Sequence, residues 1–107
     1  MQMTGDGEAY EAKARIIKAL AHPSRLKIVD ALAQGEKCVC ELQELVGSDT
    51  STVSKHLAVM KGAGVLADRK VGLRVFYRLR VPCILNVFPC VQAVLAENAK
   101  RGAAVVG

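Results

Sequence analysis

The 107-residue sequence has no tryptophan, and aromatic residues make up only 4% of it although 51% of its residues are hydrophobic. An aliphatic core is therefore expected, in one domain spanning residues 1–107, because this length is too short for two separate cores. The first ten residues, MQMTGDGEAY, lack a basic segment followed by an apolar run. The sequence therefore predicts no secretory signal peptide.

Long hydrophobic runs are also missing. The longest uncharged stretch covers residues 81–96, VPCILNVFPCVQAVLA, and it contains Asn86, Gln92 and two prolines. This stretch is shorter than the ~20 residues that a membrane-spanning helix needs. It indicates a buried helix or a subunit interface, and no membrane partner is expected.

The four cysteines do not form a C-x-x-C pair, and no histidine or acid is arranged beside one of them as a catalytic base. A glycine-rich phosphate loop is absent as well. An enzyme, such as a small thiol oxidoreductase, is therefore not predicted. Without an export signal, these thiols indicate a reducing compartment, and we expect a cytoplasmic protein. There cysteines more often bind metal, sense redox state or pack as small hydrophobes than form structural disulfides.

Positive charge is concentrated in one part of the chain. The net charge is +5, but residues 1–50 hold six Lys/Arg and eight Asp/Glu, which gives −2. Residues 51–80 hold seven Lys/Arg against Asp68 alone, which gives +6, and residues 81–107 add +1. Such a local excess is typical of a surface that faces phosphates, although a solvated basic face without a partner would show the same count.

Hydrophobic residues recur at helical spacing in four successive segments. We expect helices at residues 8–21, from a cap at Ser24 to Gly35, from the first cysteines to Val46, and at residues 50–63 after a cap at Asp49. Residues 1–7 and 101–107 are expected to be frayed tails.

The helix at residues 50–63 has two distinct faces. Val53, Leu57 and Met60 share one face, and at about 100° per residue the small or basic residues fall on the opposite one. Next come residues 65–70, a turn at 71–73 and residues 74–79, whose alternation predicts a hairpin. This order predicts a mainly α fold with a small β-hairpin, the winged helix-turn-helix, in which small polar side chains read a DNA groove.

Four segments resemble the ArsR/SmtB family of bacterial repressors: AHPSRLKIVDALAQGE (21–36), CVCEL (38–42), STVSKHLAVMKGAGVL (51–66) and DRKVGLRVFYRL (68–79). They are most similar to its arsenic- and cadmium/lead-responsive members, in which a CVCDL-type motif opens the helix before the recognition helix. The resemblance implies a homodimeric repressor that binds double-stranded operator DNA until a thiophilic ion reaches its cysteines. No other protein partner is evident.

The resemblance assigns site residues. The matching positions are Thr50, Ser51, Thr52, Ser54, Lys55 and His56 for the recognition helix, Arg69, Lys70, Gly72 and Arg74 for the wing, and Cys38 and Cys40 for the sensing thiols. The basic residues, with Lys61 added, are expected to contact phosphate, and Ser51, Thr52 and Ser54 base edges. A homodimer would carry the recognition helices about one helical turn of DNA, or a multiple of it, apart. Residues 81–96, together with the first helix, are expected to form its seam.

Two departures from the family pattern concern metal binding. Gln43 stands where a third cysteine often follows the pair, and the Asp/His set of the family's zinc site on the C-terminal helix is missing. Zinc sensing of that type is therefore not expected. Soft thiolates would select As(III) or Sb(III) as inducer, or alternatively Cd(II), Pb(II) or Zn(II).

The spacing of Cys38 and Cys40 raises a mechanical question. Residues i and i+2 lie about 200° apart on a helix, so both can face one ion only where the first turn is non-helical or unwinds. We therefore predict that ion binding distorts this helix and disturbs the helix-turn-helix. Packing would explain Cys38, which shares a face with Leu42, about as well as sensing does, but it explains Cys40 poorly.

Cys83 and Cys90 leave two interpretations open. Core or interface packing is favoured by their apolar neighbours, and Pro89 predicts that the helix restarts near them, which could bring the two closer. Alternatively, one of them supplies a third thiolate to Cys38 and Cys40, or the pair forms a second site. At the level of function, a redox or persulfide switch and a basic architectural DNA binder remain alternatives to ion sensing.

Overall fold

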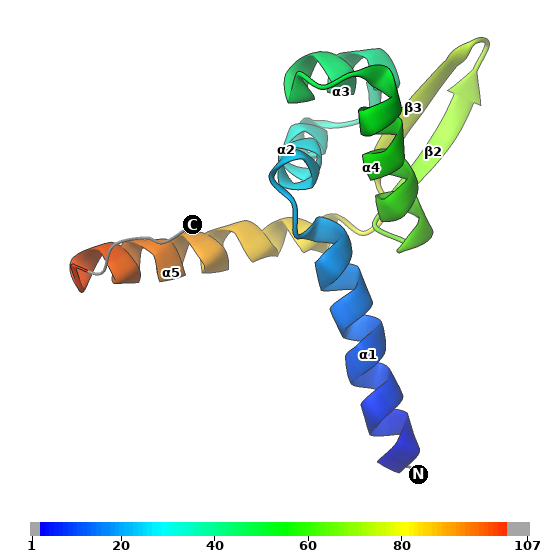
Figure 1. Ribbon diagram of the computed structural model, residues 1–107. Coiled ribbons are helices and arrows are strands. Elements are labelled where there is room, and N and C mark those ends of the chain that lie inside the picture. Colours follow the sequence, from blue (N-terminus) through cyan, green and yellow to red (C-terminus); the bar gives the residue numbers. More distant parts are fainter. Residues whose placement is uncertain (1–2, 103–107) are drawn as a thin grey trace.

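The computed structural model describes residues 3–102 (Figure 1). Its helices are α1 (Met3–Leu20), α2 (Pro23–Ala31), α3 (Val39–Val46), α4 (Thr50–Gly62) and α5 (Val87–Lys100), with 3₁₀ turns η1 (Leu32–Gln34) and η2 (Pro82–Asn86). Its strands are β1 (Lys37–Cys38), β2 (Leu66–Val71) and β3 (Arg74–Leu79), which form an antiparallel sheet in the order β1-β3-β2. The predicted winged helix-turn-helix is confirmed.

The start of the chain differs from expectation in two ways. Helix α1 begins at Met3, so residues 3–7 are helical rather than frayed, while residues 1–2 and 103–107 lie outside the described range. The cap of α2 is His22 instead of Ser24, because the His22 Nδ1 accepts the Ser24 N–H at 3.0 Å and Pro23 takes the first helical position. Proline suits that position because its missing N–H would have no helical partner there.

The core lies where α2, α3 and α4 meet the sheet. Its buried side chains are aliphatic, as the composition predicts, and comprise Leu20, Ile28, Val29, Leu32, Leu42, Val53, Leu57, Met60, Val65, Leu66 and Leu79. The predicted inner face of α4, formed by Val53, Leu57 and Met60, is within this set. The helix-turn-helix is thus anchored by one continuous apolar cluster.

Strand β1 is a short element that the periodicity did not predict. Lys37 pairs with Tyr77 and Cys38 with Phe76, so the residues just before α3 are hydrogen-bonded to the wing strand β3. Two residues are too few to produce a period-2 pattern, so only the sheet partner identifies the strand.

Helices α1 and α5 extend away from this core in different directions (Figure 1). The radius of gyration is 16.2 Å, larger than the ~13 Å of a compact chain of this length. Both arms expose apolar side chains, including Ile17 on α1 and Val91, Val94 and Leu95 on α5. Among the described residues, no helix is both long and apolar enough to cross a membrane.

The break before α5 matches the prediction from proline. Pro89 is the third residue of α5, in the first turn, where a proline does not interrupt the hydrogen-bond ladder. The preceding turn η2 carries Pro82 at its start and Cys83 next to it.

Candidate nucleic-acid interface and thiol site

The N-terminus of α4 is formed by a side-chain cap. Asp49 lies in extended conformation and its Oδ1 accepts the Thr52 N–H at 3.0 Å, as the sequence predicts. Hydrogen bonding to Thr52, through its side chain first and its N–H second, holds the pKa of the Asp49 carboxyl below its ordinary value of 3.8. The side chains of Thr50, Ser51 and Ser54 are exposed on the outer face of the helix, where they are available to a DNA groove.

His56 occupies a different position from the other predicted contacts. Its side chain is buried, its Nδ1 accepts the Arg25 Nε–H at 3.0 Å, and its ring centroid lies 4.5 Å from that of His22. Burial, followed by the nearby His22 and Arg25, lowers its pKa below the ordinary 6.5. His56 therefore ties α4 to α2 and does not join the groove-facing set, a correction to the expected DNA contact.

The wing hairpin turns through two residues, Gly72 and Leu73. Gly72 has φ +61°, and the flanking pair Val71–Arg74 closes the ladder. Glycine with positive φ at the first turn position is the pattern of a type II′ hairpin, in which a side chain would be strained. Leu73 at the tip is fully exposed.

Two of the basic side chains predicted to contact phosphate are already paired within the protein. Arg69 donates two hydrogen bonds of 2.7 Å to the Glu36 carboxylate and lies over the Phe76 ring, 5.5 Å from its centroid. Lys61 Nζ is 3.0 Å from Asp68 Oδ2. These contacts lower the pKa of Glu36 and raise those of Arg69 and Lys61. A phosphate would have to compete with these carboxylates.

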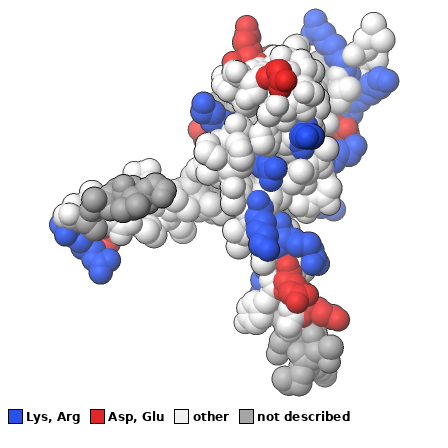
Figure 2. Space-filling model, in the orientation of Figure 1, with Lys and Arg blue, Asp and Glu red and all other residues white. Residues whose placement is uncertain are grey.

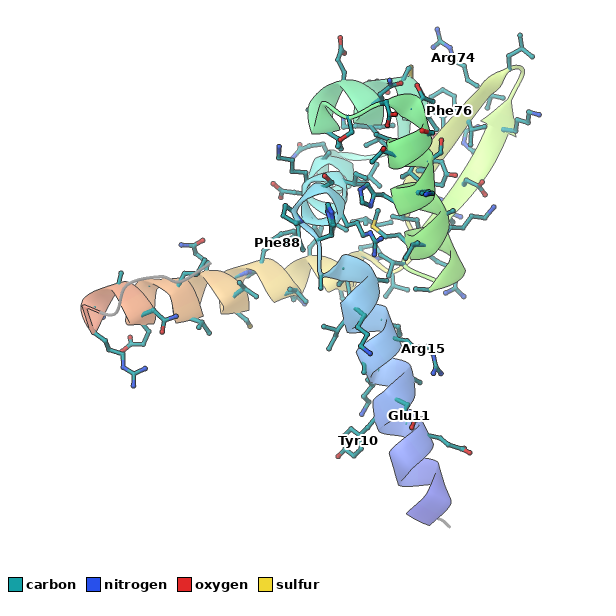
Figure 3. The ribbon with its side chains drawn as sticks, viewed as in Figure 1. Tyr10, Glu11, Arg15, Arg74, Phe76 and Phe88 are labelled. Carbon is teal, nitrogen blue, oxygen red and sulfur yellow. A yellow bond between two sulfur atoms is a disulfide. The ribbon has the colours of Figure 1, made fainter. Side chains whose placement is uncertain are left out.

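Other basic side chains are free for phosphate. Within residues 7–102, Lys55, Lys70 and Arg74 form no ion pair, and all three are exposed. Figure 2 shows Lys and Arg gathered on the wing and over the middle of this face, reaching onto α1. Arg74 extends from the wing on the side of the upper ends of α3 and α4 (Figure 3).

Cys38 and Cys40 lie at the start of α3, and their sulfur atoms are joined as a disulfide. Cys38 is the N-cap in extended conformation, buried at 4% exposure, whereas Cys40 is in the first helical turn and exposed. The Cys38 N–H donates to Glu41 Oε1 at 2.9 Å, which closes the helix start. Because Cys38 is outside the helix, the two sulfurs meet while α3 stays intact, which is the non-helical arrangement that the spacing allows as the alternative to unwinding.

A hollow of about 390 Å³ opens beside this pair. Its walls come from the β1–α3 segment, α4 and the wing, through Cys38, Cys40, Gln43, Thr50, Arg74 and Val75. The thiol site and two of the predicted DNA contacts therefore share one cavity.

Cys83 and Cys90 are unpaired, exposed, and line another cavity together. This second cavity is an apolar groove of about 600 Å³ between α1 and the η2–α5 segment, which also includes Ile17, Leu20 and Val91. Within residues 7–102, no group of three or more His, Cys, Asp or Glu side chains could hold a metal ion. In one protomer the soft donors at the first site are thus two sulfurs, enough for two of the bonds to an ion.

Three functional contacts were not anticipated from the sequence: Glu36 on Arg69, Arg25 on His56, and the pairing of β1 with the wing. The first two join residues 33 and 31 positions apart. No local spacing rule reaches that far. The only related feature of the sequence is the acidic residue Glu36, two positions before Cys38. The sequence does not show which basic residue pairs with it.

A capped helix with a polar outer face, packed on a shorter helix and followed by a basic hairpin, defines a DNA-binding protein of the winged helix-turn-helix class. The family model described as "Bacterial regulatory protein, arsR family" matches residues 22–68. The "Uncharacterized HTH-type transcriptional regulator Rv0081" of Mycobacterium tuberculosis is 35% identical over 98 residues, 91% of this chain and 86% of its own length. The chain belongs to the ArsR family of helix-turn-helix transcriptional regulators.

Other relatives match over part of their length. The "HTH-type transcriptional regulator Rv0324" of M. tuberculosis is 38% identical over 88% of this chain, which spans only 43% of that protein. The "Cadmium resistance transcriptional regulatory protein CadC homolog" of Staphylococcus aureus is 40% identical over 62% of this chain and 55% of its own length.

Solved structures share the whole fold. The homodimeric winged helix-turn-helix DNA-binding domain (fragment 1-100) of Mb0332 from Mycobacterium bovis has a TM-score of 0.77 at 31% identity, over 99% of this chain and 97% of that one. The crystal structure of Rv0081 also has a TM-score of 0.77, at 34% identity, over 90% and 97% of the two chains.

Proposed function

We propose that this protein is a homodimeric transcriptional repressor that releases its operator when a thiophilic ion, As(III) or Sb(III), binds the thiolates of Cys38 and Cys40. The observation that carries this proposal is the position of the two sulfurs. They lie together at the start of α3, beside the first turn of α4, and Cys38 is also hydrogen-bonded through β1 to the wing strand β3. A ligand there touches every element that would contact DNA.

The homodimer is supported by the two arms. The α1–α5 groove leaves apolar side chains such as Ile17 and Val91 exposed, and a second copy would cover them by the same surface on both subunits. The related Mb0332 domain is homodimeric. A dimer would carry a net charge of 2 × 5 = +10 and present two recognition helices, spaced about 34 Å or a multiple of that along the DNA.

The donor set supports a soft ion. Two sulfurs favour As(III), Sb(III), Cd(II) or Pb(II) over hard oxygen-preferring cations. The S. aureus relative is a cadmium resistance regulatory protein homolog, which supports Cd(II) as an alternative inducer. Pb(II) and Zn(II), which thiolates also bind, are further alternatives. Further ligands would come from solvent or from the partner subunit, where Cys83 and Cys90 are the available thiols.

A second candidate function rests on a separate observation. The sulfurs of Cys38 and Cys40 form a disulfide, so the pair can exist in two covalent states, and a redox or persulfide switch would use the same site. In that case oxidation, rather than ion binding, would control DNA affinity.

One titration separates these functions. An operator would be selected from random duplexes with the reduced protein, and its Kd measured by fluorescence anisotropy with As(III), Sb(III), Cd(II), Pb(II) or a mild oxidant. Ion-driven release that disappears in the Cys38→Ser/Cys40→Ser double variant is expected. The Cys83→Ser/Cys90→Ser double variant is the matched control and shows whether those thiols contribute to affinity or stoichiometry.

The outcomes point in different directions. Release by the oxidant with indifference to every ion would replace ion sensing by the redox switch. Release that persists without Cys38 and Cys40 would contradict both functions at this site and place the sensor elsewhere in the protein. Binding that no effector changes would also contradict both and leave a constitutive DNA binder.

A further inference from the structure

We propose that the thiol pair is part of the DNA-contacting surface itself, so that a ligand on Cys40 and the operator backbone exclude one another directly. This inference rests on the proposed function and specifies how release occurs. In this mechanism the operator is released because the ligand and the DNA compete for the same space, and not because α3 is distorted. The juxtaposition that carries it is the shared cavity of Cys38, Cys40, Thr50 and Arg74.

The cavity lies between the recognition helix and the wing. Thr50 is the first residue of α4, and Arg74 is the first residue of β3 after the wing turn. The recognition helix and the wing therefore form two of its walls, and the start of α3 forms the third. In a winged helix-turn-helix the two former elements contact the duplex, so a backbone that runs between them passes over this cavity.

The wing supplies an unpaired positive charge to the cavity. Arg74 has no ion pair among the described residues, whereas the amide groups at the start of α4 are already capped by the Asp49 carboxylate. Arg74 therefore attracts a phosphate to the mouth of the cavity. Arg69, in contrast, is held by Glu36, so Arg74 is the wing guanidinium that is free to make this contact.

The two cysteines differ in their exposure to solvent. Cys38 is buried at 4% exposure, whereas the Cys40 side chain is exposed and lines the same cavity. The hollow that both cysteines line is the one shared with Thr50 and Arg74, so a ligand held there by the pair faces these two residues. The helix remains formed because Cys38 is outside it, so exclusion does not require α3 to unwind.

The test is protection of Cys40 by operator DNA. Reduced protein, free or saturated with operator, is treated with iodoacetamide, which transfers its carboxamidomethyl group to the thiolate sulfur and releases iodide. The reagent is neutral, so the DNA charge does not repel it. Mass spectrometry should show Cys40 alkylation slowed on the order of tenfold by DNA. Cys83 and Cys90 line the α1–α5 groove that the proposed dimer covers with and without DNA, so DNA should leave their alkylation rates unchanged.

A charge variant provides an independent readout. Cys40→Glu places a carboxylate at the cavity mouth, and Cys40→Gln is the neutral control of the same size at this exposed position. We expect Cys40→Glu to bind the operator at least ~10-fold more weakly than Cys40→Gln, with the difference shrinking as salt rises. Equal affinities, or equal Cys40 alkylation in free and bound protein, would overturn the inference.

Failure of this inference is distinguishable from failure of the proposed function. If ions still release the operator through Cys38 and Cys40 while Cys40 stays reactive on DNA, the repressor mechanism stands and only direct exclusion is wrong. If no ion or oxidant affects binding, the proposed function fails whatever the alkylation rates are.

Discussion

His56 links the recognition helix to the start of α2 through a small cluster of nitrogen-bearing side chains. Its Nδ1 accepts from Arg25, its ring packs on His22, and His22 in turn caps α2 through the Ser24 N–H. The groups facing the imidazole are therefore a guanidinium and a second imidazole. A proton on His56 would remove the acceptor for Arg25 and place two positive charges in contact.

We expect the free energy of unfolding to decrease as pH falls below about 6.5. Burial lowers the pKa of His56 below 6.5 in the folded protein, so just under that pH the unfolded chain binds a proton that the folded chain excludes. His56 has no such effect above that range. Urea unfolding at pH 7.5 and 5.5 measures the difference, and His56→Gln, which keeps an acceptor for Arg25, should reduce it.

A matched variant tests whether the dependence comes from His56. His22→Asn keeps a helix-capping side chain but removes the other imidazole. If the change of unfolding free energy with pH is the same in His56→Gln as in the original protein but smaller in His22→Asn, the pH dependence comes from His22 and not from His56.

Glu36 and Arg74 should change DNA affinity in opposite directions. Glu36→Gln frees Arg69 for phosphate and removes a nearby negative charge, whereas Arg74→Ala removes an unpaired cation. We expect tighter binding and a salt-dependence slope steeper by about 0.9 for Glu36→Gln, and weaker binding with a slope flatter by about 0.9 for Arg74→Ala. Binding titrations at salt concentrations of roughly 50 to 200 mM would measure both slopes. A flatter slope for Glu36→Gln would show that its pair with Arg69 orders the wing for DNA.

At the scale of elements, the wing connects the thiol site to the DNA-reading surface. Strand β3 lies between β1, which ends in Cys38, and β2, which carries Arg69 and Lys70. The hairpin is held at its middle by the pairing of β1 with Phe76 and Tyr77 and by the Glu36–Arg69 ion pair, while its turn is exposed. Its geometry at the tip therefore depends on the turn residues alone.

Gly72→Ala should weaken DNA binding by straining the wing turn. A side chain at φ +61° costs about 1–2 kcal/mol, which the exposed hairpin can relieve by changing shape. Gly62→Ala is the matched control, because Gly62 is the last residue of α4 and has open space around a Cβ. There alanine should raise the free energy of unfolding by about 0.5–1 kcal/mol. Thermal unfolding and operator binding of both variants check the pair, and equal DNA affinities would show that the wing turn has no part in binding.

At the scale of the molecule, the single chain leaves apolar side chains of both arms exposed, outside its core. The arms α1 and α5 diverge (Figure 1). The groove between them is lined almost entirely by apolar side chains, including Ile17 and Val91. A monomer would leave this groove in water, at a cost of about 25 cal/mol for each Å² of apolar surface. Pairing of two copies along the arms removes that cost.

Ile17→Asp and Val91→Asp should each convert the dimer into a monomer of 11.4 kDa in light scattering after size-exclusion chromatography. A carboxylate in an apolar interface lacks a partner and is strongly disfavoured. Operator affinity should fall with dimerisation because one recognition helix then acts alone. Leu45→Asp, at an exposed apolar position of α3 outside the groove, is the control and should remain dimeric. A dimer that persists in both arm variants would place the interface elsewhere.

Much of the architecture was predictable from local patterns. The Asp49 cap, the buried stripe of α4 and the glycine turn of the wing are all set by neighbours within a few residues, so periodicity and turn chemistry identify them. The restart of the helix near Pro89 follows from the same local logic. Strand β1 and the true cap of α2 were missed. The strand depends on a partner 40 residues away, and histidine is an uncommon cap.

The candidate site, too, was partly predictable from local patterns and partly set by tertiary contacts. The sequence by itself determined which residues are available: two thiols at the start of a helix, a basic stretch over residues 51–80, and an uncharged segment at 81–96. Only the tertiary structure decided which of them meet. It places Cys40 beside Thr50 and Arg74, pairs Arg69 with Glu36, and buries His56 against Arg25. These contacts join distant residues, because the packing of α3, α4 and the sheet around one core brings their ends together, and no local spacing encodes that approach.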